Sequence, residues 1–328
     1  MKVLFLTSRG QDNLEDATLH GLRALLGPDC VDYPRKDVLY RGYDTKPVEQ
    51  CYGRLFTIWR TLDDVAIDRS DIESRLGSGH FDFVIVGSVH RVLTERSPLL
   101  GMLRRENTVV LDGEDHAGLA IQGLRFLYFK RELHWKARLV WYGNESAKWL
   151  RLPIPTRPLR IEPIAFSIPA EKIWTTPVAS AGRDQRFPHH IVDPELKTLL
   201  VEGNGAPPGD GYVHLTEEEY YSDLRRSVFG VTTKRGGWDC LRHYEIAANG
   251  AIVCFRDLDA KPARCAPEGL DGTNSLVYRD ARDLLRRTET MTSDERDGLM
   301  EAAHGWVERQ TTEHRAKHLL DVMRRRLA

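Results

Sequence analysis

The sequence lacks paired cysteines, long apolar runs and an excess of charge of one sign. Its five cysteines are scattered, odd in number and without C-x-x-C spacing, which argues against a disulfide scaffold or structural zinc and favours a reduced, cytoplasmic chain. Apolar runs such as Phe83–Gly87 are far shorter than the roughly 20 residues that span a bilayer, and Met1–Thr7 is too short for a signal peptide. We therefore expect no integral membrane segment. With 47 Lys and Arg against 48 Asp and Glu, tight binding of nucleic acid by charge alone is disfavoured, although a local basic patch is not.

The length of the chain suits two domains, since a domain holds roughly 150 residues and this chain has 328. Strand and helix patterns alternate in its first half, which favours an α/β domain. We expect strands at Lys2–Thr7, Cys30–Tyr33, Phe81–Gly87 and Asn107–Asp112, a polar loop at Ser8–Asp16, and helices at Ala17–Leu26, Leu55–Asp68 and Asp71–Leu76. The last two strands are apolar without alternation, which is typical of a parallel sheet covered on both faces. Such sheets bind ligands at the carboxyl ends of their strands.

A second strand–helix–strand unit follows far along the chain. The prolines between Pro153 and Pro169 exclude a helix there and predict an ordered crossover. After it we expect a helix capped by Thr216 and Glu219 that holds Tyr220, Leu224 and Val228, a strand at Phe229–Thr233, a helix with Asp239 as N-cap and Gly250 as C-cap, and a strand at Ala251–Phe255. A capping box at Thr292 and Glu295 and a final amphipathic stretch predict a helical C-terminal part. The patterns together predict two α/β domains that face one another.

The segment Val231–Phe255 carries the clearest chemical signal. A turn at Gly236-Gly237 lets backbone approach a ligand closely, and the helix start beyond it supplies N–H groups and a positive dipole. Lys234, Arg235 and Arg242 add fixed positive charge, which favours a phosphate or diphosphate without a metal. Glu245 lies one helical turn further, where a carboxylate can accept hydrogen bonds from ribose hydroxyls. The alternative is an ordinary turn followed by a surface ion pair between Arg242 and Glu245.

The stretch Glu245–Val253 resembles the motif of glycosyltransferases with two Rossmann-like domains (the GT-B fold), in which a glutamate, small residues and a glycine precede an apolar strand. Tyr220–Val231 and Thr273–Asp283 look like the family's flanking segments. The resemblance implies that Glu245 contacts the ribose of a nucleotide sugar and that the residues upstream face its diphosphate. The nucleotide-sugar-binding residues would then be Lys234, Arg235, Gly236, Gly237, Asp239, Arg242, His243 and Glu245. The sequence departs from the family at Asn249, where a small residue is usual, and around Pro177–Pro188, where a glycine-rich turn is expected.

The resemblance also implies the architecture. We expect an α/β chain with two Rossmann-like domains facing a central cleft. Residues 1–165 would form an acceptor domain and residues 166–310 the nucleotide-sugar domain. The final helix, 311–328, would cross back and pack on the first domain.

If the donor binds the second domain, the acceptor and the catalytic base should come from the first. The turn Asp112–His116 is the densest cluster of titratable side chains at a predicted strand end. We predict Asp115 as the base, followed by His116 and then His90, with Gly10, Asp112 and Glu114 in the acceptor-side loop. An inverting enzyme needs such a base and a retaining one does not, and the sequence leaves both open. The alternative for this turn is a solvated acidic helix cap.

A metal site is a weaker interpretation. Asp257-Leu258-Asp259 has the D-x-D pattern of metal-dependent glycosyltransferases, and the Asp112–Asp115 turn could hold Mg²⁺, but we place both below the metal-free reading. We interpret His189 and His190 as surface histidines. No cofactor is expected beyond a nucleotide-sugar co-substrate such as a UDP- or GDP-sugar.

The sequence thus predicts a metal-independent glycosyltransferase, with a glycan, a lipid-linked molecule or a small molecule as acceptor. Two alternatives remain open. One is transfer to a modified nucleic-acid base, for which the arginines of Arg35–Arg41, Arg104–Arg105 and Arg324–Arg326 could track phosphates. The other is a non-catalytic regulator that binds a nucleotide sugar in the same pocket.

Overall fold

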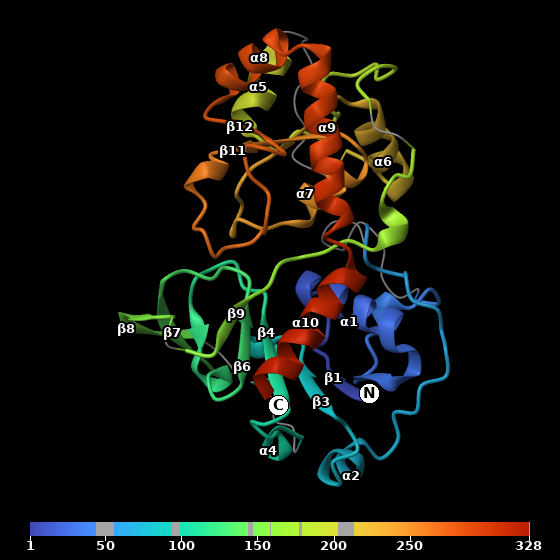
Figure 1. Cartoon of the computed structure of the whole chain (residues 1–328), viewed down its shortest axis with the longest axis vertical. Helices are drawn as coiled ribbons and strands as arrows, with labels where there is room; N and C mark the ends of the chain where they lie inside the picture. Colours follow the sequence, from blue (N-terminus) through green and yellow to red (C-terminus); the bar gives the residue numbers. More distant parts are fainter. Residues whose placement is uncertain are drawn as a thin grey trace.

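The computed structural model describes residues 1–43, 56–93, 99–143, 147–157, 159–176, 179–202 and 213–327. Leu55, the first residue of a helix predicted above, and Cys51, one of the five cysteines, lie outside these ranges. The described chain forms two lobes, one above the other in Figure 1, each with its own parallel sheet. Among the described residues, no helix is long and apolar enough to cross a membrane.

The first lobe is built on a six-stranded sheet in which every pair of neighbours is parallel. The order is β2 (Cys30–Tyr33), β1 (Val3–Leu6), β3 (Phe83–Val86), β4 (Thr108–Asp112), β6 (Leu127–Lys130) and β9 (Ile161–Pro163). Its helices are α1 (Asn13–Leu26), α2 (Ile72–Gly77), α3 (Val89–Val92) and α4 (Leu99–Met102). A small sheet of β5 (Leu119–Ala120), β7 (Lys136–Tyr142) and β8 (Ala147–Pro155) adjoins it. The core strands are buried almost throughout, as their unbroken apolar sequence predicts.

The second lobe has a three-stranded parallel sheet, β10 (Phe229–Thr232), β11 (Ile252–Arg256) and β12 (Leu276–Tyr278). Around it lie α5 (Pro194–Glu202), α6 (Glu217–Arg226), α7 (Leu241–Ala248), α8 (Ala281–Thr290) and α9 (Ser293–Glu308). The last helix, α10 (Thr312–Leu327), lies beside α1 of the first lobe (Figure 1). There the Thr312 hydroxyl meets His20 Nδ1 at 2.8 Å, and the absence of a side chain at Gly21 lets the two backbones approach. One apolar cluster runs from β1 and α1 into α7 and α9, so the core is continuous between the lobes.

Most predicted elements are confirmed, including all six strands named above and both capping boxes. Helix α1 begins four residues earlier than predicted, because the Asp12 carboxylate caps the N–H groups of Leu14 and Glu15. The predicted helix Leu55–Asp68 is wrong over its described part. Thr57 and Arg60 there have φ of 77° and 56°, outside the helical region.

Two local predictions in the second half need correction, and a third, the absence of a helix from the proline-rich segment, is confirmed in its described part. Helix α6 ends at Arg226, so Val228 follows it. The N-cap of α7 is Cys240, since the Asp239 carboxylate instead accepts hydrogen bonds from Phe166 N–H and Tyr244 O–H. The proline-rich segment has no helix in its described part, but it contains the end of β8 and all of β9. Near Pro188, in the stretch where the family has a glycine-rich turn, Gln185 makes a parallel bridge to Ser227, next to β10.

Candidate functional site

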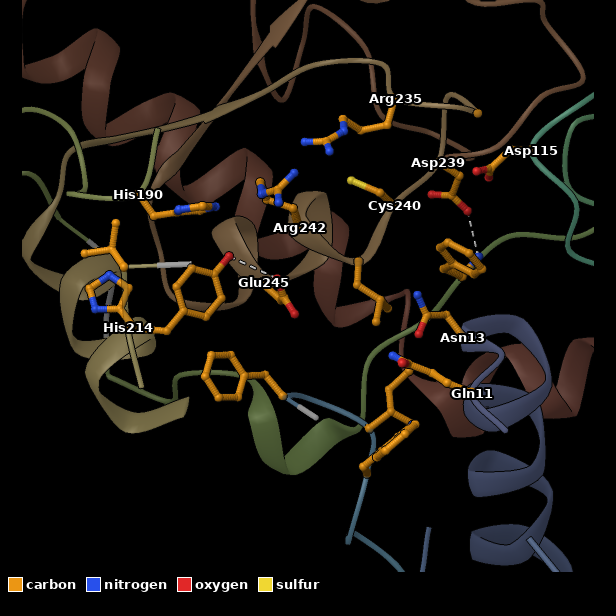
Figure 2. A pocket seen from close by; sticks show the side chains of 18 residues that line it. Gln11, Asn13, Asp115, His190, His214, Arg235, Asp239, Cys240, Arg242 and Glu245 are labelled. Carbon is orange, nitrogen blue, oxygen red and sulfur yellow. Dashed lines mark hydrogen bonds between the residues drawn. The ribbon is translucent and has the colours of Figure 1, made fainter. Parts of the chain in front are cut away.

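A pocket of about 220 Å³ lies between the two lobes (Figure 2). From the first lobe and the segment that follows it, the lining residues are Gln11, Asn13, Phe56, Ile58, Trp59, Asp115 and Phe166. From the second they are His190, Val213, His214, Tyr220, Arg235, Gly237, Asp239, Cys240, Leu241, Arg242 and Glu245. Five predicted nucleotide-binding residues thus line one pocket, together with the predicted base. Lys234, Gly236 and His243 do not line it.

The wall formed by Arg235, Arg242 and His190 is cationic. Burial, together with repulsion from Arg242 and His214, lowers the pKa of His190 to about 4, so this imidazole is neutral at physiological pH. The positive charge of the Arg235 and Arg242 guanidinium groups would attract an anion into the pocket, and His190 would add a neutral hydrogen-bonding group beside them. His190 and His214 were missed from the sequence because the first stands in a proline-rich loop and the second near the start of α6, with no metal-ligand spacing.

Glu245 points toward the middle of the pocket from α7 (Figure 2). Its carboxylate accepts hydrogen bonds from the hydroxyls of Thr57, at 2.5 Å, and Tyr220, at 3.0 Å. Burial is the main cause that raises the pKa of Glu245, and the hydrogen bond from Thr57 and the charge of Arg242 oppose it. The carboxylate is therefore arranged to accept from hydroxyl groups, as predicted for a ribose. The hydroxyl of Thr57, from the first lobe, makes one of the hydrogen bonds that a ribose hydroxyl would otherwise make to Glu245.

The Gly236-Gly237 turn is approached by the first lobe, which the sequence did not predict. A Cβ on Gly236 would lie 2.4 Å from Asp115 Oδ2, and one on Gly237 would lie 2.5 Å from Glu132 Oε1. The N–H groups of Trp238 and Asp239 donate to that same Glu132 oxygen, at 2.8 and 3.4 Å. The backbone N–H groups of these two residues, which lie between the turn and α7, are thus satisfied by a carboxylate of the protein.

Arg131 completes this junction. Its guanidinium, fully buried, donates to Asp239 O at 2.7 Å, to Gly113 O at 2.9 Å and to the carboxylate of Asp115. It also lies 3.3 Å from Glu132 Oε1. These contacts raise the pKa of Arg131 against the effect of burial, which lowers it. The sequence offered a signal for this pair, since charged residues directly follow the apolar run of β6.

Cys240 and His243 form a second buried pair at the start of α7. Nε2 of His243 lies 2.9 Å from Trp238 O, an acceptor, so this nitrogen carries a proton. Nδ1 then faces the hydroxyl of Thr232 at 3.0 Å and Sγ of Cys240 at 3.9 Å. Although burial raises the pKa of the Cys240 thiol, the neighbouring His243 lowers it to about 7 overall. His243 is fully buried, so its predicted contact with a nucleotide is replaced by this role behind the pocket wall.

Lys234, likewise predicted to face the diphosphate, lies with Nζ 5.1 Å from the centre of the Trp238 ring, outside the lining of the pocket. Gly10 has a φ of 86°, and its carbonyl accepts from Lys36 Nζ at 2.6 Å, while its neighbour Gln11 reaches the pocket. The first-strand loop therefore contributes to the cleft through Gln11 rather than Gly10.

The predicted acceptor turn divides into buried and exposed parts. Asp112 is buried and accepts from Lys130 Nζ at 2.7 Å and from Tyr128 O–H, so it is a structural residue rather than an acceptor contact. Asp115 lines the pocket but is ion-paired with Arg131. Glu114, Asp115 and His116 also line a neighbouring hollow of about 430 Å³.

Both candidate histidines are engaged. Nδ1 of His116 accepts from Gly118 N–H at 3.0 Å, and Nε2 lies 3.0 Å from the hydroxyl of Tyr142. Burial lowers the pKa of His116. His90 Nε2 lies 3.1 Å from Glu114 Oε1, and its other nitrogen lies 3.2 Å from Ser88 Oγ. Neither imidazole thus offers an uncommitted nitrogen to a hydroxyl in the pocket.

Two sets of side chains could be considered for a metal. Asp259 of the D-x-D pattern is bound by Arg279, at 2.7 Å to Oδ1, and Asp257 lies 3.3 Å from the same guanidinium, so both carboxylates are paired with protein and neither lines the pocket. Elsewhere, Glu132, His134 and Cys265 come within 4.8 Å of one another. Within that set, Glu132 is already ion-paired with Arg131 and accepts from the amide of Trp238, so its carboxylate is engaged by the protein.

The similarity of this chain to known proteins was found by comparing structures, not sequences. No model of a protein family matches the chain, and no curated protein matches its sequence. Similar solved structures are HepE from Anabaena in complex with UDP and glucose (TM-score 0.55, 10% identity, 99% of this chain and 100% of that one) and a glycosyltransferase from Rickettsia africae (0.53, 9%, 99% and 98%). A third is the trehalose-6-phosphate synthase OtsA (0.52, 11%, 99% of both chains). Since these likenesses cover the whole chain, and its two parallel-sheet lobes agree with them, the protein has the GT-B glycosyltransferase fold.

Proposed function

We propose that the protein is a glycosyltransferase that takes a sugar from a nucleoside diphosphate bound in the pocket between the lobes. The observation that carries the proposal is the pairing of a cationic wall with a buried carboxylate: Arg235 and Arg242 on one side and Glu245 below them. Two guanidinium groups suit a diphosphate, and Glu245 already accepts from two hydroxyls, as it would from a ribose. The solved neighbour with UDP and glucose supports the same class of donor.

The positions of the first-lobe carboxylates and imidazoles favour transfer with retention. An inverting transfer needs a protein base for the acceptor hydroxyl, and Asp115, His116 and His90 are each engaged by other groups. In transfer with retention, the bond from the anomeric carbon to the diphosphate breaks, the bond to the acceptor oxygen forms on the same face, and the departing phosphate oxygen takes the acceptor's proton. Arg235 and Arg242 would stabilise that departing diphosphate without a metal ion. The acceptor would be a glycan, a lipid-linked molecule or a small molecule, in the cytoplasm.

A thermal-shift screen across nucleoside diphosphate sugars tests the donor site. A ligand present at about one hundred times its Kd adds roughly 2.7 kcal/mol of stability, so the right donor should raise the melting temperature clearly. Arg242→Gln and Glu245→Gln should abolish that shift, whereas Arg279→Gln, which removes an exposed guanidinium outside the pocket, should keep it. The absence of a shift with every UDP-, GDP-, ADP- and TDP-sugar would overturn the proposal.

The engaged side chains also favour a second candidate, a protein that binds a nucleotide sugar without transferring it. Donor hydrolysis in the absence of acceptor separates the two. Slow release of free sugar, with the anomer of the donor seen first by NMR, supports a retaining enzyme. Tight binding with no release supports the binding protein.

A further inference from the structure

The β7–β8 hairpin, taken here as Trp135 with the strands Lys136–Tyr142 and Ala147–Pro155, concentrates exposed apolar side chains. In the part of the chain that the structure describes, nine large apolar side chains are strongly exposed, and five of them belong to this hairpin. They are Trp135, Trp141, Trp149, Leu150 and Leu152, and the exposed fraction of Leu152 reaches 79%. Figure 1 shows the hairpin projecting from the side of the first lobe, with β8 at its outer edge. Polar residues normally protect a free edge strand from aggregation. A cluster of exposed apolar side chains at such an edge therefore indicates a surface that binds a partner.

The outward face of the hairpin combines apolar and cationic side chains. Trp141 pairs across the strands with Lys148, so both lie on one face. Leu150 and Leu152 follow Lys148 along β8, opposite the register shift between Arg138 and Val140, and both are exposed. The opposite face is anchored, since Trp149 and Val140 lie against the position where a Gly118 side chain would be.

The charge of the hairpin is one-sided in an otherwise balanced chain. Residues 136–155 contain four Lys and Arg and one Glu, whereas the whole chain has a net charge of −1. Lys136, Arg138 and Lys148 are all exposed. A symmetric contact between two copies through this face would bring the same cations against each other, which disfavours a second copy of the chain as the partner. Tryptophan and leucine flanked by lysine and arginine instead match the interface of a bilayer with anionic headgroups.

We propose that the β7–β8 hairpin binds the protein to an anionic lipid surface, with Trp141, Leu150 and Leu152 entering the headgroup region and the cations contacting phosphates. The hairpin is tied to the first-lobe turn, because Tyr142 bonds His116 at 3.0 Å and Trp149 packs against the same ring at 4.7 Å between centroids. Membrane binding would therefore bring the Asp112–His116 turn close to the lipid. If the proposed function holds, this arrangement suits an acceptor that is itself a lipid or is attached to one.

Co-sedimentation with vesicles tests the proposal on the full chain. We expect binding to phosphatidylcholine vesicles that contain phosphatidylglycerol to exceed binding to phosphatidylcholine alone by at least about tenfold, and to weaken with salt. The double variant Lys136→Gln/Lys148→Gln and the single variant Leu152→Ser should each lower the partition coefficient about tenfold. Matched controls are Lys317→Gln and Val65→Ser, which change exposed residues elsewhere and should bind like the unchanged protein.

Several outcomes would overturn the proposal. They are no sedimentation with either vesicle, equal loss in the control variants, or self-association that Leu152→Ser abolishes while vesicles stay unbound. Thermal melts should show all variants folded, because each altered side chain is exposed. The nucleotide-induced melting shift reports the proposed function separately, and hairpin variants should retain it, so failure of one proposal is distinguishable from failure of the other.

Discussion

The junction at the Gly236-Gly237 turn gives the sharpest test of the structure, through alanine at each glycine. Neither glycine has a φ in the left-handed region, so backbone strain plays no part. A Cβ on Gly237 would press on Glu132 Oε1 at 2.5 Å, and Glu132 is buried and bonded to Trp238 N–H at 2.8 Å. A Cβ on Gly236 would lie 2.4 Å from Asp115 Oδ2 and 2.9 Å from Asp115 Cβ, but the Asp115 side chain is 62% exposed and can shift toward solvent at the expense of its ion pair with Arg131.

The difference in magnitude follows from that contrast. Gly237→Ala must displace Glu132, which costs about 1–3 kcal/mol for overpacking and about 1.5–3 kcal/mol for a weakened hydrogen bond to a charged group. We therefore expect a loss of about 3–5 kcal/mol in the free energy of unfolding. For Gly236→Ala we expect a smaller loss, about 1–2 kcal/mol, because moving Asp115 weakens its half-exposed ion pair with Arg131. Urea unfolding, followed by tryptophan fluorescence, measures both variants on the same scale.

Two results would refute this reasoning. Equal, small losses for both variants would show that Glu132 does not clamp the turn. A Gly237→Ala protein of unchanged stability that no longer binds nucleotide would restore the interpretation made from the sequence, in which the glycine serves the close approach of a phosphate. Glu132→Gln offers an independent check, since it keeps the shape but removes the charge next to Arg131.

Three further outcomes are expected. Because the pKa of Cys240 is lowered to about 7, the rate at which iodoacetamide alkylates it should reach half its maximum near pH 7 rather than near the usual value of about 8.5. Mass spectrometry measures this alkylation, and bound nucleotide should slow it because Cys240 lines the pocket. Gly21→Ala should cost about 3 kcal/mol in chemical unfolding, since its Cβ would lie 2.0 Å from a backbone oxygen of α10, whereas Gly298→Ala, in open space on α9, should add up to about 1 kcal/mol. Thr57→Ala should destabilise the ligand-free protein by about 1–2 kcal/mol, because Glu245 loses a hydrogen bond. Calorimetry should show nucleotide binding about tenfold tighter, since the ribose would then supply that hydrogen bond, and weaker binding would contradict this prediction.

The elements that the sequence predicted well are those set by local physics. Unbroken apolar runs gave β3 and β4, and Thr216 with Glu219 marked the start of α6. The failed helix at Leu55–Asp68 shows the limit of such patterns. Its apolar spacing suits a helix, but Ile58 and Trp59 are buried in the core and Phe56 reaches the interlobe pocket, and the chain bends through positive φ to place them. Tertiary packing overrode the local preference there.

The candidate site shows the same division. Arg242 and Glu245 could be placed because they lie on one helix, a turn apart, and both do line the pocket. Asn249, which departs from the family motif, is explained only by the fold: its side-chain amide donates to Glu245 O at 2.9 Å, and its oxygen accepts from Arg225. The charged residues after β6 are visible in the sequence, but their partners in the other lobe are not, so neither the contact of Glu132 with the backbone of Trp238 nor the contact of Thr57 with Glu245 could be predicted.

The interlobe contacts bear on how the pocket would work. Arg131 and Glu132, from the first lobe, bind the backbone just before α7, and Asp239 in turn bonds Phe166, in the segment that leads to the second lobe. The start of α7 is therefore fixed from both sides, whereas the opposite wall at Thr57 is joined to the second lobe through hydroxyl contacts, to Glu245 and Tyr221, and through its N–H to Glu217. A ligand that offers hydroxyls of its own can replace the contact with Glu245 at little cost, but none can replace a buried Arg131. Any opening of the cleft on nucleotide binding should then begin at Thr57 and leave the junction at Glu132 in place.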